Sequence, residues 1–98
     1  MRRLNWTALS RRDLHGINGW LTDNADPEIA VDIVIRIRDR ATLLIDHPFA
    51  GAVEHDVIRR LRVPRTSYLI LYRVPDDRQV EILRIRHVRE DRFTSDPS

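Results

Sequence analysis

The sequence predicts an α+β domain in which an N-terminal helical hairpin packs on a small antiparallel β-sheet. Two observations lead to this fold class. Through the first half of the chain, apolar residues recur at steps of three and four, which places them on one side of a helix. From Val57 onward they alternate with other residues, which is the period of a strand. Helices followed by a run of strands are typical of α+β domains.

Length and composition indicate one small folded domain. The chain has 98 residues, of which 42% are hydrophobic and 33% charged, an apolar content too high for disorder throughout. We expect a single domain over residues 1–93 and a disordered polar tail over residues 94–98. The chain has no cysteine, which excludes disulfides, cysteine zinc sites and a thiol nucleophile. Because no membrane-spanning run or signal-peptide pattern is present, we expect a cytoplasmic protein.

The first half of the chain carries the signals of a short strand and two helices. Residues 2–6 favour the strand. Thr7 is a suitable N-cap for a helix that continues to about Asp23. Asp26 and Pro27 then begin a second helix, since aspartate is favoured at the cap and proline at the first helical position. The turn between the helices is short, so we expect them to lie antiparallel.

The second helix, predicted over residues 27–46 and ended by Pro48, has the clearest apolar stripe. The stripe consists of Ala30, Ile33, Val34, Ile37, Ala41, Leu44 and Ile45. Val31 and Ile35 lie off this stripe and form a second apolar strip. They either widen the face toward the core or belong to a surface for a partner, and we favour the core interpretation.

The second half of the chain is expected to form a three-stranded meander. Residues 48–56 are predicted to be a loop, and a strand begins at Val57. Residues 67–74 are apolar on both faces, as expected of a central strand, and residues 80–87 return beside them after a hairpin loop at 75–78. Four apolar side chains of these two strands are expected to face the helices: Leu69, Leu71, Leu83 and Ile85.

Several kinds of chemical site find no support in the sequence. The four histidines are scattered and none has metal-ligand spacing with another. The three glycines do not form a phosphate-cradling loop, and no serine lies in a nucleophile elbow. The pair Asp76 and Asp77 falls in a predicted turn, where aspartate is common for backbone reasons. We therefore expect no metal and no cofactor.

Arginine is the enriched residue type. All 17 basic residues are arginine, and 15 acidic residues reduce the net charge to +2. Arg60 and Arg62 alternate along one predicted strand, and Arg84 and Arg86 along another, so the four share one face if both strands flank the central strand. Their guanidinium groups would suit phosphate or carboxylate. Two further residues could add stacking surfaces to this face: Tyr68 and Tyr72.

This face admits three interpretations. It could bind nucleic acid through phosphate contacts and stacking. It could belong to a ribonuclease in which arginine stabilises the transition state and His87 moves protons. It could also be a solvated surface whose arginines pair with the acidic residues. Composition and spacing leave all three open.

A set of short motifs follows in order along about residues 4–90. They are Trp6-Thr7-Ala8, Asp13-Leu14, Asp26-Pro27, Ala30, Leu44, His47-Pro48, Gly51, Arg60-Leu61, Tyr68 to Val74 and Val80 to His87. This ordered set resembles the RelE/ParE superfamily of bacterial type II toxin–antitoxin toxins. The hairpin that begins Tyr-x-x-x-Tyr-Arg-Val and ends in a histidine is its most specific part. The resemblance implies a strand, a helical hairpin and a three-stranded meander.

The resemblance implies one of two mechanisms. RelE-like members are ribosome-dependent mRNA endonucleases with a catalytic arginine directly after the first hairpin tyrosine, where this chain has Leu69. They also tend to carry a tyrosine or arginine soon after the last strand, where this chain has Val88, and Phe93 lacks a hydroxyl. Loss of a transition-state arginine should slow cleavage by orders of magnitude. These departures favour the ParE branch, whose members are not enzymes and inhibit DNA gyrase.

Each mechanism implies its own partners and residues. An endonuclease would act on mRNA at the ribosome, with a rearranged site of Arg60, Arg73, Arg84 and His87. A ParE-like toxin would form a hetero-oligomer with a cognate antitoxin, whose C-terminal segment covers apolar side chains. The antitoxin-binding candidates are Val31, Ile35, Tyr68 and Tyr72. The gyrase-binding candidates are Arg60, Arg62, Arg84, Arg86, His87 and Arg89. A third interpretation is a binding module without toxicity.

Overall fold

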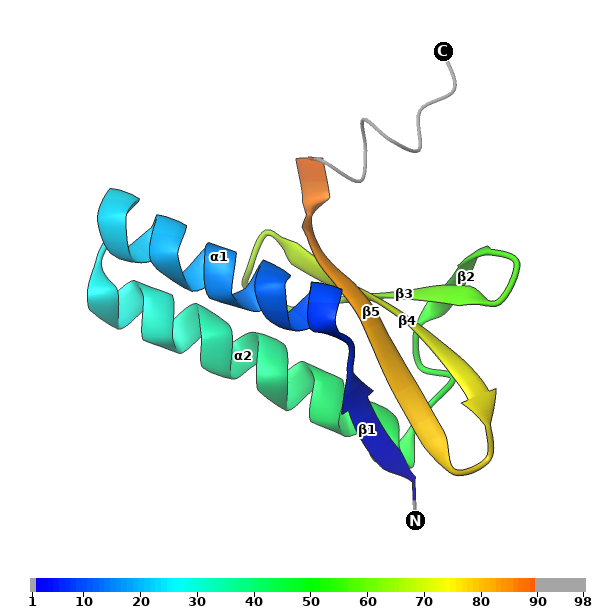
Figure 1. Cartoon of the computed structure of the whole chain (residues 1–98). Coiled ribbons are helices and arrows are strands. Elements are labelled where there is room, and N and C mark those ends of the chain that lie inside the picture. Colours follow the sequence, from blue (N-terminus) through cyan, green and yellow to red (C-terminus); the bar gives the residue numbers. More distant parts are fainter. Residues whose placement is uncertain (1, 90–98) are drawn as a thin grey trace.

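The computed structural model describes residues 2–89, which form two helices and five strands (Figure 1). In chain order these are β1 (Arg3–Trp6), α1 (Ala8–Asn24), α2 (Pro27–Asp46), β2 (Ala52–His55), β3 (Ile58–Arg62), β4 (Tyr68–Asp76) and β5 (Gln79–His87). The helices form an antiparallel hairpin that lies on one side of the sheet. The predicted α+β class is confirmed. Phe93 and the predicted tail 94–98 lie outside the described residues.

Both helices begin at the predicted caps. The Thr7 hydroxyl accepts a hydrogen bond from Ser10 N–H at 3.2 Å, and Asp26 Oδ1 accepts one from Glu28 N–H at 2.7 Å. Pro27 lies in the first turn of α2, where its missing N–H removes no helical hydrogen bond. The stripe of α2 is buried at Ala30, Ile37, Ala41 and Leu44, as predicted. Neither described helix is long and apolar enough to cross a membrane.

The strands are ordered β1-β5-β4-β3-β2, so β3 and β5 flank the central β4 as predicted. The sheet is mixed rather than antiparallel, because β1 runs parallel to β5 while the other neighbours are antiparallel. A parallel neighbour needs a long connection, and here the helical hairpin and the first strands of the meander separate β1 from β5. Turn signals report only on strands that are consecutive in the chain, so they carry no information about this pair.

Two loop predictions need correction. β2 lies within the predicted loop 48–56 and pairs with β3, with a register shift between Val53 and His55. Its four residues are mostly exposed, so no alternation of apolar residues marks the strand. The predicted loop 75–78 is shorter, because β4 continues to Asp76. Asp76 Oδ1 accepts a hydrogen bond from Arg78 N–H at 2.7 Å, which lowers the pKa of the Asp76 carboxyl.

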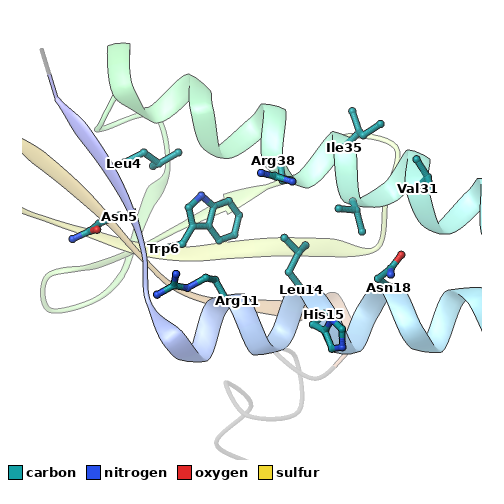
Figure 2. A pocket seen from close by; sticks show the side chains of 11 residues that line it. Leu4, Asn5, Trp6, Arg11, Leu14, His15, Asn18, Val31, Ile35 and Arg38 are labelled. Atoms are coloured by element: carbon teal, nitrogen blue, oxygen red, sulfur yellow. The ribbon is translucent and has the colours of Figure 1, made fainter.

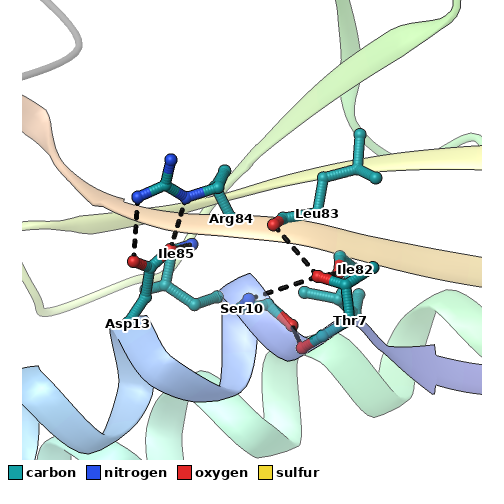
Figure 3. A network of polar contacts seen from close by, with 7 residues as sticks. All are labelled: Thr7, Ser10, Asp13, Ile82, Leu83, Arg84 and Ile85. Carbon is teal, nitrogen blue, oxygen red and sulfur yellow. Dashed lines mark hydrogen bonds and ion pairs between the residues drawn. The ribbon is translucent and has the colours of Figure 1, made fainter.

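The core lies between the helices and one face of the sheet. It packs Leu61, Val63, Ile70, Tyr72, Val80, Ile82 and Ile85 against Ile37, Ala41 and Leu44 of α2. Of the four strand residues predicted to face the helices, Ile85 does so. Leu69 and Leu71 do not, because they alternate with the core residues of β4. Leu83 also points away from α1 (Figure 3).

Two physical causes explain why the sequence does not predict which residues of β4 and β5 face the helices. Both faces of β4 are apolar, so its sequence does not distinguish the side that meets the helices. In β5 a bulge interrupts the period of two, because Leu71 pairs with Arg84 and the next residue of β4 pairs with Ile82. Ile82 and Ile85 therefore both join the core although they are three residues apart.

Tyr72 anchors the loop after α2 to the core. Its side chain is fully buried, and its hydroxyl accepts a hydrogen bond from Gly51 N–H at 2.9 Å. Burial raises the pKa of the Tyr72 hydroxyl. A Cβ on residue 51 would lie 2.8 Å from this hydroxyl and 2.7 Å from the Arg60 carbonyl oxygen, so a glycine is required for the close approach. The Arg59 guanidinium donates to the Gly51 carbonyl oxygen at 2.8 Å.

Candidate functional site

The sheet face opposite the helices carries two rows of residues that cross β3, β4 and β5. The register partners in these rows are Arg60, Leu71 and Arg84, then Arg62, Leu69 and Arg86. The backbone positions of the four predicted arginines therefore share one face, which confirms the alternation. We call this surface, defined by Arg60, Arg62, Arg84 and Arg86, the arginine face.

Acidic neighbours neutralise part of the positive charge of the arginine face. Arg60 Nε lies 3.5 Å from Glu54 Oε2. The Arg84 guanidinium donates two hydrogen bonds to the Asp13 carboxylate, at 2.8 and 3.0 Å. These contacts support the interpretation of a surface whose arginines pair with acidic residues.

Asp13 holds the Arg84 guanidinium at the edge of the sheet (Figure 3). β1 pairs with β5 only as far as Ile82, and the start of α1 binds the next part of that edge. Thr7 donates through its N–H and hydroxyl to the Ile82 carbonyl oxygen at 3.1 and 2.8 Å, and Asp13 Oδ2 accepts from Ile85 N–H at 3.0 Å. Because 71 residues separate Asp13 from Arg84, no local spacing in the sequence signals this contact.

The two tyrosines of β4 do not join the arginine face. Tyr72 is fully buried in the core, so its predicted roles in stacking and in antitoxin contact are wrong for the folded chain. Tyr68 lies on the helix side as well, because it alternates with the arginine-face residues of β4. Its ring meets that of its register partner His87 edge-on, with centroids 5.4 Å apart and planes at 85°.

Val31 and Ile35 lie in a groove between α1, α2 and β1, which we call the β1 groove (Figure 2). Its volume is about 770 Å³, and its further apolar lining is Leu4, Trp6, Leu14 and Val34. Val31 is 55% exposed and Ile35 is 50% exposed, so the core interpretation of these two residues is wrong. Arg11 and Arg38 line the groove, and none of the described lining residues is acidic. An exposed apolar surface of this kind indicates an interaction site.

A second cavity, which we call the His87 cleft, lies on the other side of α1 and has a volume of about 750 Å³. It is formed by α1, the start of α2, the loop between β3 and β4, and the end of β5. It brings Tyr68 together with Arg84 and His87, whereas Val31 and Ile35 line the β1 groove. Two exposed arginines that the sequence does not single out also line the cleft: Arg12 and Arg65. Arg89 is exposed beside it, and its N–H donates to His87 Nδ1 at 3.1 Å.

The four residues of the predicted nuclease site do not converge. Arg60 and Arg73 occupy positions on the face opposite the helices, whereas the side chains of Arg84 and His87 both line the His87 cleft. Each of the three arginines is paired with a carboxylate, from Glu54, Glu81 and Asp13 respectively. Within residues 2–89 no group of three or more histidine, aspartate or glutamate side chains is arranged to hold a metal ion.

The family comparison agrees with this fold. A family model described as the ParE toxin of the type II toxin–antitoxin system, parDE, matches residues 4–92. This match spans most of the chain and defines it as a toxin of a type II toxin–antitoxin system. The chain belongs to the ParE toxin family.

Solved structures show the same architecture. A chain of the chromosomal ParDE toxin–antitoxin system from P. aeruginosa superimposes with a TM-score of 0.79 at 28% identity, covering 89% of this chain and 96% of that chain. The solution structure of the conserved hypothetical protein HP0894 from Helicobacter pylori superimposes with a TM-score of 0.54 at 20% identity, covering 89% and 94%. The second likeness concerns the fold alone. No curated protein sequence matches the chain.

Proposed function

We propose that this ParE-type toxin inhibits DNA gyrase without catalysing a reaction, and that a cognate antitoxin silences it in a hetero-oligomer in the cytoplasm. A toxin–antitoxin system implies an antitoxin partner, so family membership supports that part of the proposal. The choice of gyrase over mRNA rests on Leu69.

Leu69 occupies the position at which nuclease members of the superfamily carry a catalytic arginine. Its side chain is apolar and 3% exposed, so it offers no donor to the negative charge that develops during phosphodiester cleavage. The remaining candidates do not compensate, because Arg60 and Arg84 are ion-paired and Arg60 lies on the face opposite the helices, away from His87. A protein target therefore fits these residues better than RNA cleavage.

The β1 groove fits the antitoxin better than any part of the arginine face. Val31 and Ile35 provide exposed apolar area between the cationic side chains of Arg11 and Arg38. An antitoxin segment that folds on binding could bury apolar side chains there and place carboxylates beside the two arginines. Tyr68 lies in the other cavity, so we restrict the proposed antitoxin contact to the groove.

A supercoiling assay with purified toxin, gyrase and relaxed plasmid tests the gyrase target. We expect the toxin to block supercoiling or to trap gyrase–DNA cleavage complexes, and the protein encoded by the neighbouring reading frame to reverse the effect. Normal supercoiling at excess toxin, with no trapped complexes, contradicts the proposal.

Two further observations separate the alternatives. A ribosome-dependent endonuclease would cut mRNA in the ribosomal A site, and His87→Ala would abolish toxicity. We expect intact mRNA on translating ribosomes in the presence of the toxin. Induced expression that leaves growth unchanged would instead favour a binding module without toxicity.

A further inference from the structure

The His87 cleft has an exposed apolar half. Ile17, Trp20, Ile29 and Ile33 line it from the two helices. Trp20 is 61% exposed and Ile29 is 48% exposed, although both flank a cavity of about 750 Å³. Tryptophan that is both accessible and next to a concave surface is typical of the residues that dominate protein–protein binding.

The other half of the cleft is cationic. Arg12 of α1 and Arg65 of the β3–β4 loop are exposed at the cleft and Arg84 lies beside them. Among the described lining residues Asp13 is the one carboxylate, and it already accepts hydrogen bonds from Arg84 and from Ile85 N–H. The cleft therefore attracts a carboxylate from outside.

The loop that presents Arg65 is ordered by its own hydrogen bonds. The Thr66 hydroxyl donates to the Val63 carbonyl oxygen at 2.8 Å and accepts from Tyr68 N–H at 3.1 Å. Arg65 itself has a φ of 64°, in the left-handed region that favours glycine. An arginine held in that conformation lines the cleft beside the Tyr68 and His87 rings.

From the charge and the apolar area together, we infer that the His87 cleft binds a segment of the toxin's target in which a carboxylate stands beside a bulky apolar side chain. This inference rests on the proposed function and assigns the segment to gyrase. The carboxylate meets Arg12 and Arg65, and the apolar side chain packs on Trp20. Nucleic acid is the alternative occupant, because Trp20 could stack on a base and the two arginines could bind phosphate. We favour a protein segment because Ile17, Ile29 and Ile33 give the cleft an aliphatic half that suits an apolar side chain.

The target cleft is separate from the antitoxin groove. The α1 residues that line the groove are Arg11, Leu14, His15 and Asn18, and those that line the cleft include Arg12, Gly16, Ile17 and Trp20. At 3.6 residues per turn these two sets fall on opposite sides of α1. Antitoxin and gyrase therefore contact the same helix from different sides, so the two kinds of binding can be lost independently.

The test measures gyrase inhibition and binding to the protein of the neighbouring reading frame for the same set of full-length variants. Arg12→Glu reverses a charge in the cationic half of the cleft, and Trp20→Ala removes the tryptophan from the apolar half. Arg65→Gly removes the guanidinium and suits the left-handed backbone, so we expect this variant to stay folded, which circular dichroism checks. Matched controls are Arg78→Glu in the β4–β5 turn and Phe49→Ala, an aromatic that is 62% exposed outside the cleft.

We expect the three cleft variants to need at least about tenfold more protein for half-maximal inhibition of gyrase, while the controls inhibit like the wild type. Antitoxin binding should stay within about twofold in all variants, because the groove is unchanged. Cleft variants that inhibit as well as the wild type overturn the inference and leave the gyrase proposal intact. A wild type that does not inhibit gyrase contradicts the proposed function itself.

Two other outcomes also count against the inference. If folded cleft variants lose antitoxin binding as well, the two surfaces are not separate. If the wild type binds single-stranded RNA or DNA, and Arg12→Glu abolishes that binding without affecting gyrase inhibition, the cleft is a nucleic-acid site.

Discussion

The two faces of the β-sheet use their side chains in different ways. On the helix side Ile70, Tyr72 and Ile82 are fully buried against α2. On the opposite side the long cationic side chains of the arginine face flank Leu69 and Leu71, and Arg60 and Arg84 are paired with acids. The first face supplies stability through packing, whereas the second tolerates change because its ion pairs are partly solvated. Substitutions of the same severity should therefore have very different costs on the two faces.

The largest loss of stability is expected on the helix side. Ile37 of α2 is fully buried in the hydrophobic core, so Ile37→Ala should lower the free energy of unfolding by about 2–5 kcal/mol. Urea denaturation followed by circular dichroism measures this difference. A loss below about 0.5 kcal/mol would mean that this face is not the packed one.

A smaller loss is expected where the loop after α2 meets Tyr72. Gly51→Ala would place a methyl group 2.7 Å from the Arg60 carbonyl oxygen and 2.8 Å from the Tyr72 ring. Such overpacking costs about 1–3 kcal/mol, because backbone and a buried ring must both shift. The control is Gly19→Ala, since a Cβ there meets nothing within 4 Å. If both variants lose equal stability, the close approach at residue 51 is not what selects glycine.

Tyr72→Phe should cost about 1 kcal/mol at neutral pH, because the buried Gly51 N–H loses its acceptor. The difference from the wild type should shrink at high pH. An unfolded tyrosine ionises near pH 10, whereas burial raises the pKa of Tyr72 in the folded chain. Above pH 10 the unfolded wild type therefore releases a proton that the folded one keeps, and the wild type loses stability as pH rises toward the folded pKa.

This pH effect is measurable because the chain has no lysine or cysteine to titrate in the same range. Urea denaturation of wild type and Tyr72→Phe at about pH 8 and about pH 11 provides the comparison, and Tyr68 is common to both proteins. An unchanged difference between the two proteins would show that the Tyr72 hydroxyl is not buried.

The smallest effect is expected on the arginine face. Arg62 is exposed, so Arg62→Gln should change the free energy of unfolding by less than about 0.5 kcal/mol. The same denaturation experiment applies. A loss comparable with that of Ile37→Ala would remove the contrast between the two faces.

The parts of the fold that depend on neighbouring residues could be predicted from the sequence. Thr7, Asp26 and Pro27 mark helix ends by local hydrogen bonding, and the period of two placed Arg60 and Arg62 on one side of β3. The face of β4 could not be predicted, because apolar residues on both sides satisfy the same pattern. The parallel pairing of β1 likewise has no local signal.

The candidate site was predictable only as a set of residue types. Alternation along the strands predicts that the arginines share one face. The hydrogen bonds between Asp13 and Arg84 instead depend on how α1 packs along the edge of β5. The same packing creates the β1 groove and the His87 cleft, so it decides that Ile35 and Tyr68 belong to different surfaces. Each cavity is lined by residues from several segments of the chain, so no single segment of the sequence predicts it.

The most direct test of gyrase as the target is a titration of purified toxin into gyrase acting on relaxed plasmid. If gyrase is the target, we expect dose-dependent loss of supercoiled product or accumulation of cleaved plasmid, and recovery when the antitoxin is added. Full supercoiling at every toxin concentration, by a protein that is folded and binds its antitoxin, would contradict gyrase as the target.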